Sequence, residues 1–360
     1  SLAGGATGMI GDPGGKSAER NLLSREQLAY NYGRICLQLG RLLDFSAAGN
    51  PARIVNNADW TAPISFLDFL RDVGKHFSLG SMIAKDSVKN RLGSEAGISF
   101  TEFSYQLLQA NDFCHLRQDL NCELQIGGTE QWGNITAGTD LIRKKTGLSA
   151  WGLTFPLITK ADGTKFGKTA GGNIWLDAER TSPYKFYQYW LNTSDVDAEK
   201  YIKIFTFLDK ATIDALLAEH VEAPHLRVLQ KKLAEELTVM IHGAAEHEKA
   251  VFASQAFFKP TVDDLKLLDL KTLADVFQSL DQAEVSLAEI EAGYPIVDAF
   301  VKSGFLSSGN ETRRALKENA VSVNKVKVTE EYVISTNDLI ANTFVLLQKG
   351  KKNYYILKVV

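Results

Sequence analysis

Three polar side chains on one predicted helix are the first residues that could do chemistry. The stretch from 101 to 113 has the apolar pattern of a core helix, yet Tyr105, Gln109 and Asp112 are spaced four and three residues apart. At that spacing they lie on one helix face. Buried polar groups need hydrogen-bonding partners, so we expect these groups to meet either other side chains or a small polar ligand.

A second polar group follows a predicted strand end. The segment from Leu124 to Ile126 has apolar residues at both ends, and the residues after it are Gly127, Gly128, Thr129, Glu130 and Gln131. Asp12 comes at the end of another short strand and a glycine-rich turn. Ligands of parallel α/β sheets bind beyond the carboxyl ends of the strands. We therefore expect both segments to border one crevice.

A glycine-bounded loop carries three lysines, Lys160, Lys165 and Lys168, and ends at Thr169. A flexible cationic loop beside a crevice is typical of a phosphate clamp, since lysine acts as a compact charge. The alternative is a solvated surface loop. The earlier segment 13–17 is not a phosphate-binding P-loop, because Ile10 stands where that motif needs glycine.

The elements that would position these residues alternate between strand and helix. Helices are predicted from Ser24 to Gly40, over 65–80 and over 135–145, with strands over 52–57 and 153–159. This order predicts a parallel α/β sheet. The aromatic face of the 65–80 helix belongs either to the core or to a subunit interface. From Ser182 the pattern is helical, with further segments at 196–208, 210–219, 224–242 and 244–256.

The C-terminal part has a different composition. Residues 258–292 are acidic and read as a linker. Residues 293–360 hold ten Lys/Arg against six Asp/Glu, although the whole chain has a net charge of −3. Two predicted helices and several strands make a small basic α/β module, which suits RNA binding. A dimerisation module is the alternative.

Composition limits the remaining classes. No apolar run approaches the ~20 residues of a membrane span. The three cysteines do not form a disulfide framework and suit a reducing cytoplasm. The histidines show no metal-ligand spacing, so no metal site is expected from protein ligands.

Four motifs in order resemble bacterial-type tyrosyl-tRNA synthetases of class I. They are GGATGMIGDP (4–13), GISFTEFSYQLLQA (97–110), LQIGGTEQWGNITAG (124–138) and KADGTKFGKT (160–169), the last carrying a KMSKS-type signature. The resemblance implies a tyrosine–tRNA ligase that joins L-tyrosine to ATP and passes the tyrosyl group to tRNA(Tyr). A tryptophan enzyme fits less well, given Asp112 and the basic C-terminal module.

The resemblance also implies roles for residues. Tyr105, Gln109 and Asp12 would hold the ammonium group of tyrosine, and Asp112 would accept a hydrogen bond from its hydroxyl. Gly128, Glu130 and Gln131 would lie at the ATP ribose and the reacting carboxyl group. Lys165, Lys168 and Thr169 would grip the pyrophosphate, with Lys168 also counted as an ATP ligand and Mg²⁺ held mainly by phosphates.

By the same resemblance the chain has five parts. They are a partial Rossmann-like catalytic domain with a dimer-contact insertion (1–152), a KMSKS-type loop linker (153–181), a helical anticodon-arm-binding domain (182–258), a linker (259–291) and an S4-like RNA-binding domain (292–360). A cytoplasmic homodimer is expected, with its contact near the 65–80 helix or Phe100.

Three features depart from the family pattern. Asn111 stands where the family usually has tyrosine, between Ala110 and Asp112. Thr129 and Glu130 stand where the family usually has Ser and Asp. The HIGH-type signature should precede Gly4, so we expect an N-terminally truncated form that is poorly active alone. A non-catalytic RNA-binding protein on a synthetase scaffold is the alternative.

Overall fold

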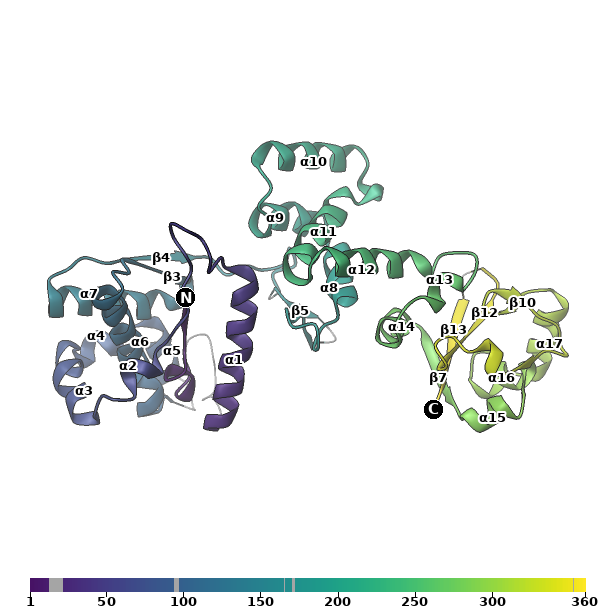
Figure 1. The fold of residues 1–360 in the computed structure, drawn as a ribbon, viewed down its shortest axis with the longest axis horizontal. Coiled ribbons are helices and arrows are strands. Elements are labelled where there is room, and N and C mark those ends of the chain that lie inside the picture. Colours follow the sequence, from purple (N-terminus) through teal and green to yellow (C-terminus); the bar gives the residue numbers. More distant parts are fainter. Residues whose placement is uncertain (13–21, 94–96, 165, 170–171, 352) are drawn as a thin grey trace. The chain divides into compact units, whose positions relative to one another are not determined.

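The computed structural model describes residues 1–12, 22–93, 97–164, 166–169, 172–351 and 353–360 (Figure 1). The chain forms two compact units, Ser1–Phe166 and Gly167–Val360, and each is described by itself. Within the described ranges, no helix has the length and apolar character needed to cross a bilayer. The five predicted domain limits stay predictions.

The first unit contains two pairs of parallel strands. The pairs are β1 (Leu2–Ala3) with β2 (Val55–Asn56), and β3 (Leu124–Gly128) with β4 (Trp151–Phe155). Each connection contains a helix, α1 (Arg25–Leu42) in the first and α7 (Trp132–Thr146) in the second. Parallel strands joined through helices confirm the predicted α/β class.

The segment between β2 and β3 is helical. Its elements are α2 (Ala58–Thr61), α3 (Phe66–Asp72), η2 (Gly74–His76), α4 (Leu79–Ile83), α5 (Asp86–Leu92) and α6 (Phe100–Asp119). The prediction of one helix over 65–80 is wrong. Gly74 follows α3 and disfavours its continuation, and Ser78 begins a new helix by accepting a hydrogen bond from the Ser81 amide.

The aromatic face of this segment divides between core and surface. Val73 is buried and packs with Phe69 and Phe77 in the core. Phe66 is 66% exposed and Leu70 is 41% exposed. The core alternative therefore holds for Val73, Phe69 and Phe77, and the subunit interface stays a prediction for the exposed side chains.

The core of the first unit lies where α6 packs against α7. Ala110, Phe113 and Cys114 of α6 meet Leu141 and Ile142 of α7 in one buried cluster. The two helices come close at Gly138, because a Cβ there would lie 2.8 Å from Cδ1 of Phe113. This packing fixes the face of α6 that points away from the core and carries the polar stripe.

The second unit begins with a helical region. After the short antiparallel pair β5 (Lys168–Thr169) and β6 (Gly172–Asn173), its elements are α8 (Pro183–Leu191), α9 (Asp195–Phe205), α10 (Lys210–Glu222), η4 (Pro224–Leu226), α11 (Val228–His242) and α12 (Ala244–Ala256). The predicted helices are confirmed. Ser182 caps α8 and Pro183 occupies its first turn.

A five-stranded sheet follows, in the order β10-β9-β12-β13-β7. The strands are β7 (Asp281–Val285), β9 (Val321–Val323), β10 (Val326–Lys327), β12 (Phe344–Lys349) and β13 (Asn353–Val359), and a separate pair is β8 (Tyr294–Pro295) with β11 (Val333–Ile334). The helices are α13 (Asp263–Lys266), α14 (Leu270–Phe277), α15 (Leu287–Glu291), α16 (Ile296–Lys302), η5 (Thr336–Asp338) and α17 (Gly309–Lys317).

Both faces of this sheet are covered (Figure 1). Alternate residues of β12 explain this, since Val345 and Leu347 pack under α15–α17 while Leu346 packs against α12–α14. Strand β7 lies within the predicted linker, where the sequence did not predict a strand. It pairs in parallel with β13.

Candidate functional site

Helix α6 brings the polar stripe to a cavity. Tyr105, Gln109 and Asp112 all line a hollow of about 900 Å³. The helix begins at Ser99, whose side chain accepts from the Glu102 amide. Arg91 and Glu102 form a buried bidentate ion pair, 2.7 Å and 3.1 Å between nitrogen and oxygen. Capping and the ion pair fix the start of α6 against α5.

Asp112 is the most buried member of the stripe, with 2% of its surface exposed. Its Oδ2 accepts a hydrogen bond from Asn57 Nδ2 and its Oδ1 accepts one from Trp60 Nε1, both at 2.8 Å. Burial raises the pKa of Asp112 to about 6, and the two hydrogen bonds oppose that rise. The carboxyl group is therefore poised to change its charge between the acidic and neutral range.

Asn57 connects the cavity to the first strand pair. Besides Asp112, its Nδ2 donates to Thr7 Oγ1 at 2.9 Å, and its Oδ1 accepts from the Ala6 amide at 2.8 Å. The side chain is fully buried. Thr7 lies in η1 (Thr7–Met9), directly after β1, and it also lines the cavity. Asn57 thus holds the ends of β1 and β2 against α6.

Sequence reasoning missed Asn57 and Trp60. Trp60 stacks on His115, with ring centroids 4.2 Å apart, so its indole is held in place to donate to Asp112. Asn57 ends the strand predicted over 52–57, which is the position that places a side chain at a crevice. That signal was available, whereas nothing in the sequence indicates Trp60.

The end of β3 supplies a second wall. Gln131 lines the same cavity as Asp112, and its Nε2 donates to Asp12 Oδ2 at 2.6 Å. Asp12 lines an adjoining hollow of about 520 Å³ together with Tyr105. The structure therefore brings together all five residues predicted for tyrosine binding, from α6, the segment after η1, and η3 (Thr129–Gln131).

Gly128 and Glu130 lie in contact at this strand end. A Cβ on Gly128 would stand 2.3 Å from Glu130 Oε2, so a side chain there would displace the carboxylate from its place over the backbone. Glu130 is exposed. Thr129 Oγ1 donates to the Phe155 carbonyl at 2.9 Å, which ties the turn to the end of β4.

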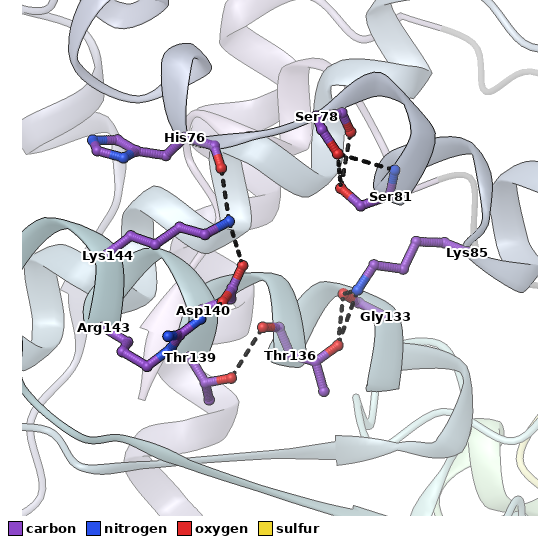
Figure 2. Close-up of polar contacts among 10 residues, drawn as sticks. All are labelled: His76, Ser78, Ser81, Lys85, Gly133, Thr136, Thr139, Asp140, Arg143 and Lys144. Carbon is purple, nitrogen blue, oxygen red and sulfur yellow. Dashed lines mark hydrogen bonds and ion pairs between the residues drawn. The ribbon is translucent and has the colours of Figure 1, made fainter.

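Helix α7 begins directly after Gln131 and is held by the segment 74–85 (Figure 2). Lys85 Nζ donates to the Gly133 carbonyl at 2.9 Å and to Thr136 Oγ1 at 3.0 Å. Lys144 Nζ donates to the His76 carbonyl at 2.9 Å. Burial lowers the pKa of Lys85. These contacts fix both ends of α7 and thereby the position of the turn that carries Gln131.

The lysine loop starts with an ordered turn. Asp162 Oδ1 accepts from the Thr164 amide at 2.9 Å and from its hydroxyl at 2.6 Å. Lys165 lies outside the described residues. Lys168 and Thr169 form strand β5 in the second unit. The clamp and the solvated loop therefore both stay predictions.

The cavity is lined by both polar and apolar side chains. Besides the polar groups, apolar side chains line it, among them Leu116, Leu124 and Ile126. Gln125 also lines it, and its Oε1 is buried without a hydrogen-bond partner in the described part of the chain. The same described part contains no cluster of three His, Cys, Asp or Glu side chains that could hold a metal. Such a hollow suits an organic ligand with an apolar body and polar ends.

Two family models match the chain. The model described as "tRNA synthetases class I (W and Y)" matches residues 1–259. The model described as "Tyrosine--tRNA ligase SYY-like C-terminal domain" matches residues 273–357. Together they cover both units of the structure.

Curated relatives are similar along the whole chain. A tyrosine--tRNA ligase of Flavobacterium johnsoniae is 58% identical over 365 residues, which span 100% of this chain and 85% of that protein. A tyrosine--tRNA ligase of Bacteroides fragilis is 56% identical over 362 residues, spanning 99% of this chain and 84% of that protein.

Solved structures share the fold. The C-terminally truncated mitochondrial tyrosyl-tRNA synthetase of Aspergillus nidulans is 31% identical with a TM-score of 0.62, covering 71% of this chain and 76% of that one. The corresponding Coccidioides posadasii protein is 33% identical with a TM-score of 0.60, covering 69% and 72%. This likeness supports the Rossmann-like arrangement of the parallel strands.

Proposed function

The chain belongs to the tyrosyl-tRNA synthetase family of class I, and on that premise we propose that it activates L-tyrosine with ATP and transfers the tyrosyl group to tRNA(Tyr). The observation that carries the proposal is Asp112, a buried carboxyl group on the wall of a partly apolar cavity. A phenol has an apolar ring that fits such a cavity and a hydroxyl at its end, from which the carboxyl group of Asp112 would accept a hydrogen bond. The comparisons do not favour a non-catalytic RNA-binding protein.

In the proposed complex the two ends of tyrosine meet different groups. The hydroxyl donates to Asp112, whose two oxygens retain acceptor capacity beside Asn57 and Trp60. The ammonium group is held by Tyr105, Gln109 and Asp12. The hydrogen bond between Gln131 and Asp12 supports this assignment, because it places two groups side by side at one end of the substrate. Asp12 would bind the ammonium group, and the Gln131 amide would donate to the substrate carboxylate.

Activation then requires positioning rather than a covalent enzyme intermediate. The tyrosine carboxylate attacks the α-phosphorus of ATP and pyrophosphate leaves. We assign Gly128 and Glu130 to the ribose, with the glycine allowing close approach of the nucleotide. Lys165, Lys168 and Thr169 are assigned to the pyrophosphate, whose growing charge they stabilise in the transition state. Magnesium would enter with the nucleotide, as MgATP.

Transfer to tRNA is assigned to both units. The C-terminal match and the excess of basic residues over 293–360 support RNA binding by the five-stranded sheet and its helices. The terminal ribose hydroxyl attacks the activated carbonyl and AMP leaves. The three cysteines, which are all free thiols, support a cytoplasmic location.

A second copy of the chain is the proposed occupant of an apolar face on the first unit. A hollow of about 550 Å³ is lined by Phe66, Leu79 and Phe100 with other apolar side chains. These three are 66%, 67% and 69% exposed. Large aromatic patches of this kind mark interfaces, and a two-fold contact would cover the same patch on both copies. Light scattering of Phe100→Asp against wild type tests this, since an unchanged mass would exclude the face.

Tyrosine-dependent ATP–pyrophosphate exchange tests the function. The protein should catalyse exchange with tyrosine and not with phenylalanine or tryptophan. Lys168→Ala should slow exchange by about 10²-fold or more while leaving tyrosine binding within about twofold, because the contact strengthens only as pyrophosphate leaves.

The matched control is Lys160→Ala, which removes a lysine from the same loop. Exchange that depends equally on both lysines would indicate a general charge effect and would reject the specific clamp. Exchange that is independent of the amino acid supplied would reject the tyrosine assignment.

A further inference from the structure

The turn between β9 and β10 has an unusual residue in it. Asn324 and Lys325 form a two-residue hairpin loop, with Val323 paired to Val326 on either side. Both have positive φ angles, 48° and 67°. Hairpin loops of this type favour Asn-Gly, because glycine adopts the left-handed backbone freely and a side chain does so at a cost. A lysine in this place indicates that its side chain compensates for the strain.

The lysine side chain reaches out of the sheet to the end of α12. Its Nζ donates to the carbonyl of Phe257 at 2.6 Å and to that of Lys259 at 2.5 Å. It also lies 5.5 Å from the centroid of the Phe257 ring. Phe257 is the C-terminal cap of α12, where carbonyls lack helical partners and carry partial negative charge. Lys325 is therefore the cation that satisfies this helix end.

Burial supports the same conclusion. Lys325 is half-buried, and desolvation lowers its pKa, with Asp264 opposing the change. Two charged groups lie at this contact, Asp264 and Lys259, and their own ion pair measures 3.7 Å. A lysine on the open surface would remain hydrated and mobile. The ammonium group of Lys325 has lost part of its hydration and is held by the two carbonyls and the ring.

Asn324 anchors the other end of the connection. Its Nδ2 donates to the Asp338 carbonyl at 2.6 Å, and its Oδ1 accepts from the Leu346 amide at 3.0 Å. Leu346 lies in β12, the central strand of the sheet. The turn is thus fixed to the sheet through Asn324 and to the helical region through Lys325.

The sheet also meets this region through apolar packing, since Leu346 and Ile356 share a buried cluster with Ala253 and Ala256 of α12, and other polar contacts run through α14. Asp275 accepts from Lys185 Nζ at 2.7 Å and from the Ser182 hydroxyl, both at the start of α8. Lys271 Nζ donates to the Ala178 carbonyl at 2.9 Å. Lys325 adds a polar contact that starts from a turn of the sheet.

We propose that Lys325 is a positioning residue for tRNA, holding the C-terminal sheet against α12 so that both regions contact one RNA molecule at a fixed spacing. The proposal rests on the tRNA function proposed above. Two binding surfaces joined rigidly act with a higher effective concentration than two that move independently. Loss of the contact therefore weakens tRNA binding and leaves amino-acid activation unchanged, because the activation site lies in other residues.

Substitutions of Lys325 can distinguish its effect on the stability of the turn from its contact with the end of α12. Lys325→Gly relieves the backbone strain of the turn and removes the contact with α12, so a loss of activity cannot come from a weakened hairpin. Lys325→Met keeps the apolar stem and removes the donors. Asn342→Gly is the matched control, because Asn342 is an exposed residue with φ 55° in another turn of the same domain.

The expected result is a split between the two half-reactions. Both Lys325 variants should raise the KM for tRNA in aminoacylation by about tenfold, the effect of one charged hydrogen bond, with kcat and tyrosine-dependent pyrophosphate exchange unchanged. Amide exchange at residues 258–259 should become about tenfold faster. Lys325→Arg should restore most of the affinity, and Asn342→Gly should behave as wild type.

Two results would overturn the proposal. Equal KM values and equal amide exchange in Lys325→Gly and Asn342→Gly would show that the contact positions nothing. A parallel fall in pyrophosphate exchange would indicate a general folding defect instead. Failure of the tRNA function itself is distinguishable, because wild type would then not aminoacylate while the amide-exchange comparison would still report on the contact.

Discussion

Protonation of Asp112 should control tyrosine binding. A phenol hydroxyl donates to a carboxylate more strongly than to a neutral carboxyl group, so tyrosine favours the ionised form. The pKa of Asp112 is raised to about 6 in the free chain. At pH 5 about nine in ten molecules carry the neutral acid, and the affinity for tyrosine falls by about tenfold from its value at pH 7.5.

Isothermal titration with tyrosine at both pH values measures this directly. Phenylalanine lacks the hydroxyl and should show no such loss, so the preference for tyrosine over phenylalanine narrows as the pH falls. Asp112→Asn should bind tyrosine weakly and independently of pH over this range. A wild-type affinity that is equal at pH 5 and pH 7.5, or a pH effect that persists in Asp112→Asn, would refute the assignment.

The same pKa has a consequence for stability. Because the pKa of Asp112 is raised from 3.8, the unfolded chain loses this proton at lower pH than the folded chain. Ionisation therefore destabilises the fold as pH rises from ~4 to ~6, by about 3 kcal/mol for about two pKa units. The free energy of unfolding of Asp112→Asn, measured relative to that of wild type, should therefore increase by about that amount between pH 4 and pH 7.5. Hydrogen bonds that the substitution loses shift this difference equally at both pH values.

Three further substitutions test the packing around the cavity. Asn57→Ala removes a buried side chain that makes three hydrogen bonds, so urea denaturation should show a loss of about 3 kcal/mol and titration a weaker tyrosine affinity. Arg91→Met leaves a buried carboxylate unpaired and should cost about 3–5 kcal/mol by the same assay, with Arg91→Met/Glu102→Leu recovering most of it; a double mutant no more stable than the single one would contradict this. Gly138→Ala presses a methyl group onto the Phe113 ring and should cost about 1–3 kcal/mol in thermal unfolding.

Local periodicity predicted the part of the site that one helix carries. Tyr105, Gln109 and Asp112 share a face because of their spacing alone, and the structure places them along one cavity. The strand ends after β1 and β3 were also predictable, since apolar residues followed by glycine mark them. These signals are local, and they survive in the fold because tertiary packing does not oppose them.

Elements whose sequence conflicts with their environment were not predicted. Strand β7 has the sequence DQAEV, in which Asp281, Gln282 and Glu284 are exposed and Val285 is buried. It is an edge strand, so only one flank pairs with the sheet and most of its side chains face solvent. Such a strand resembles a linker in composition, and its partner β13 lies more than 70 residues later.

Over 65–80 the sequence predicted a continuous helix where the structure has several short ones. The apolar residues there follow a helical period, which predicts one long helix. Gly74 and the capping Ser78 interrupt it, and the backbone turns so that Val73 enters the core while Phe66 stays exposed. A period in hydrophobicity reports which residues share a face only while the helix continues, and local breakers decided the outcome here.

The partners of Asp112 show why the site required the fold. Asn57 and Trp60 are 55 and 52 residues away along the chain, so no local pattern relates them to α6. Both are neutral donors, and they hold the carboxylate in place without cancelling its charge. The desolvation cost therefore remains in the free protein, as the raised pKa indicates. A ligand hydroxyl that adds a third donor lowers this desolvation cost, whereas a ligand without a hydroxyl leaves the cost in place. Discrimination between tyrosine and phenylalanine at this position therefore depends on Asn57 and Trp60 as much as on Asp112 itself.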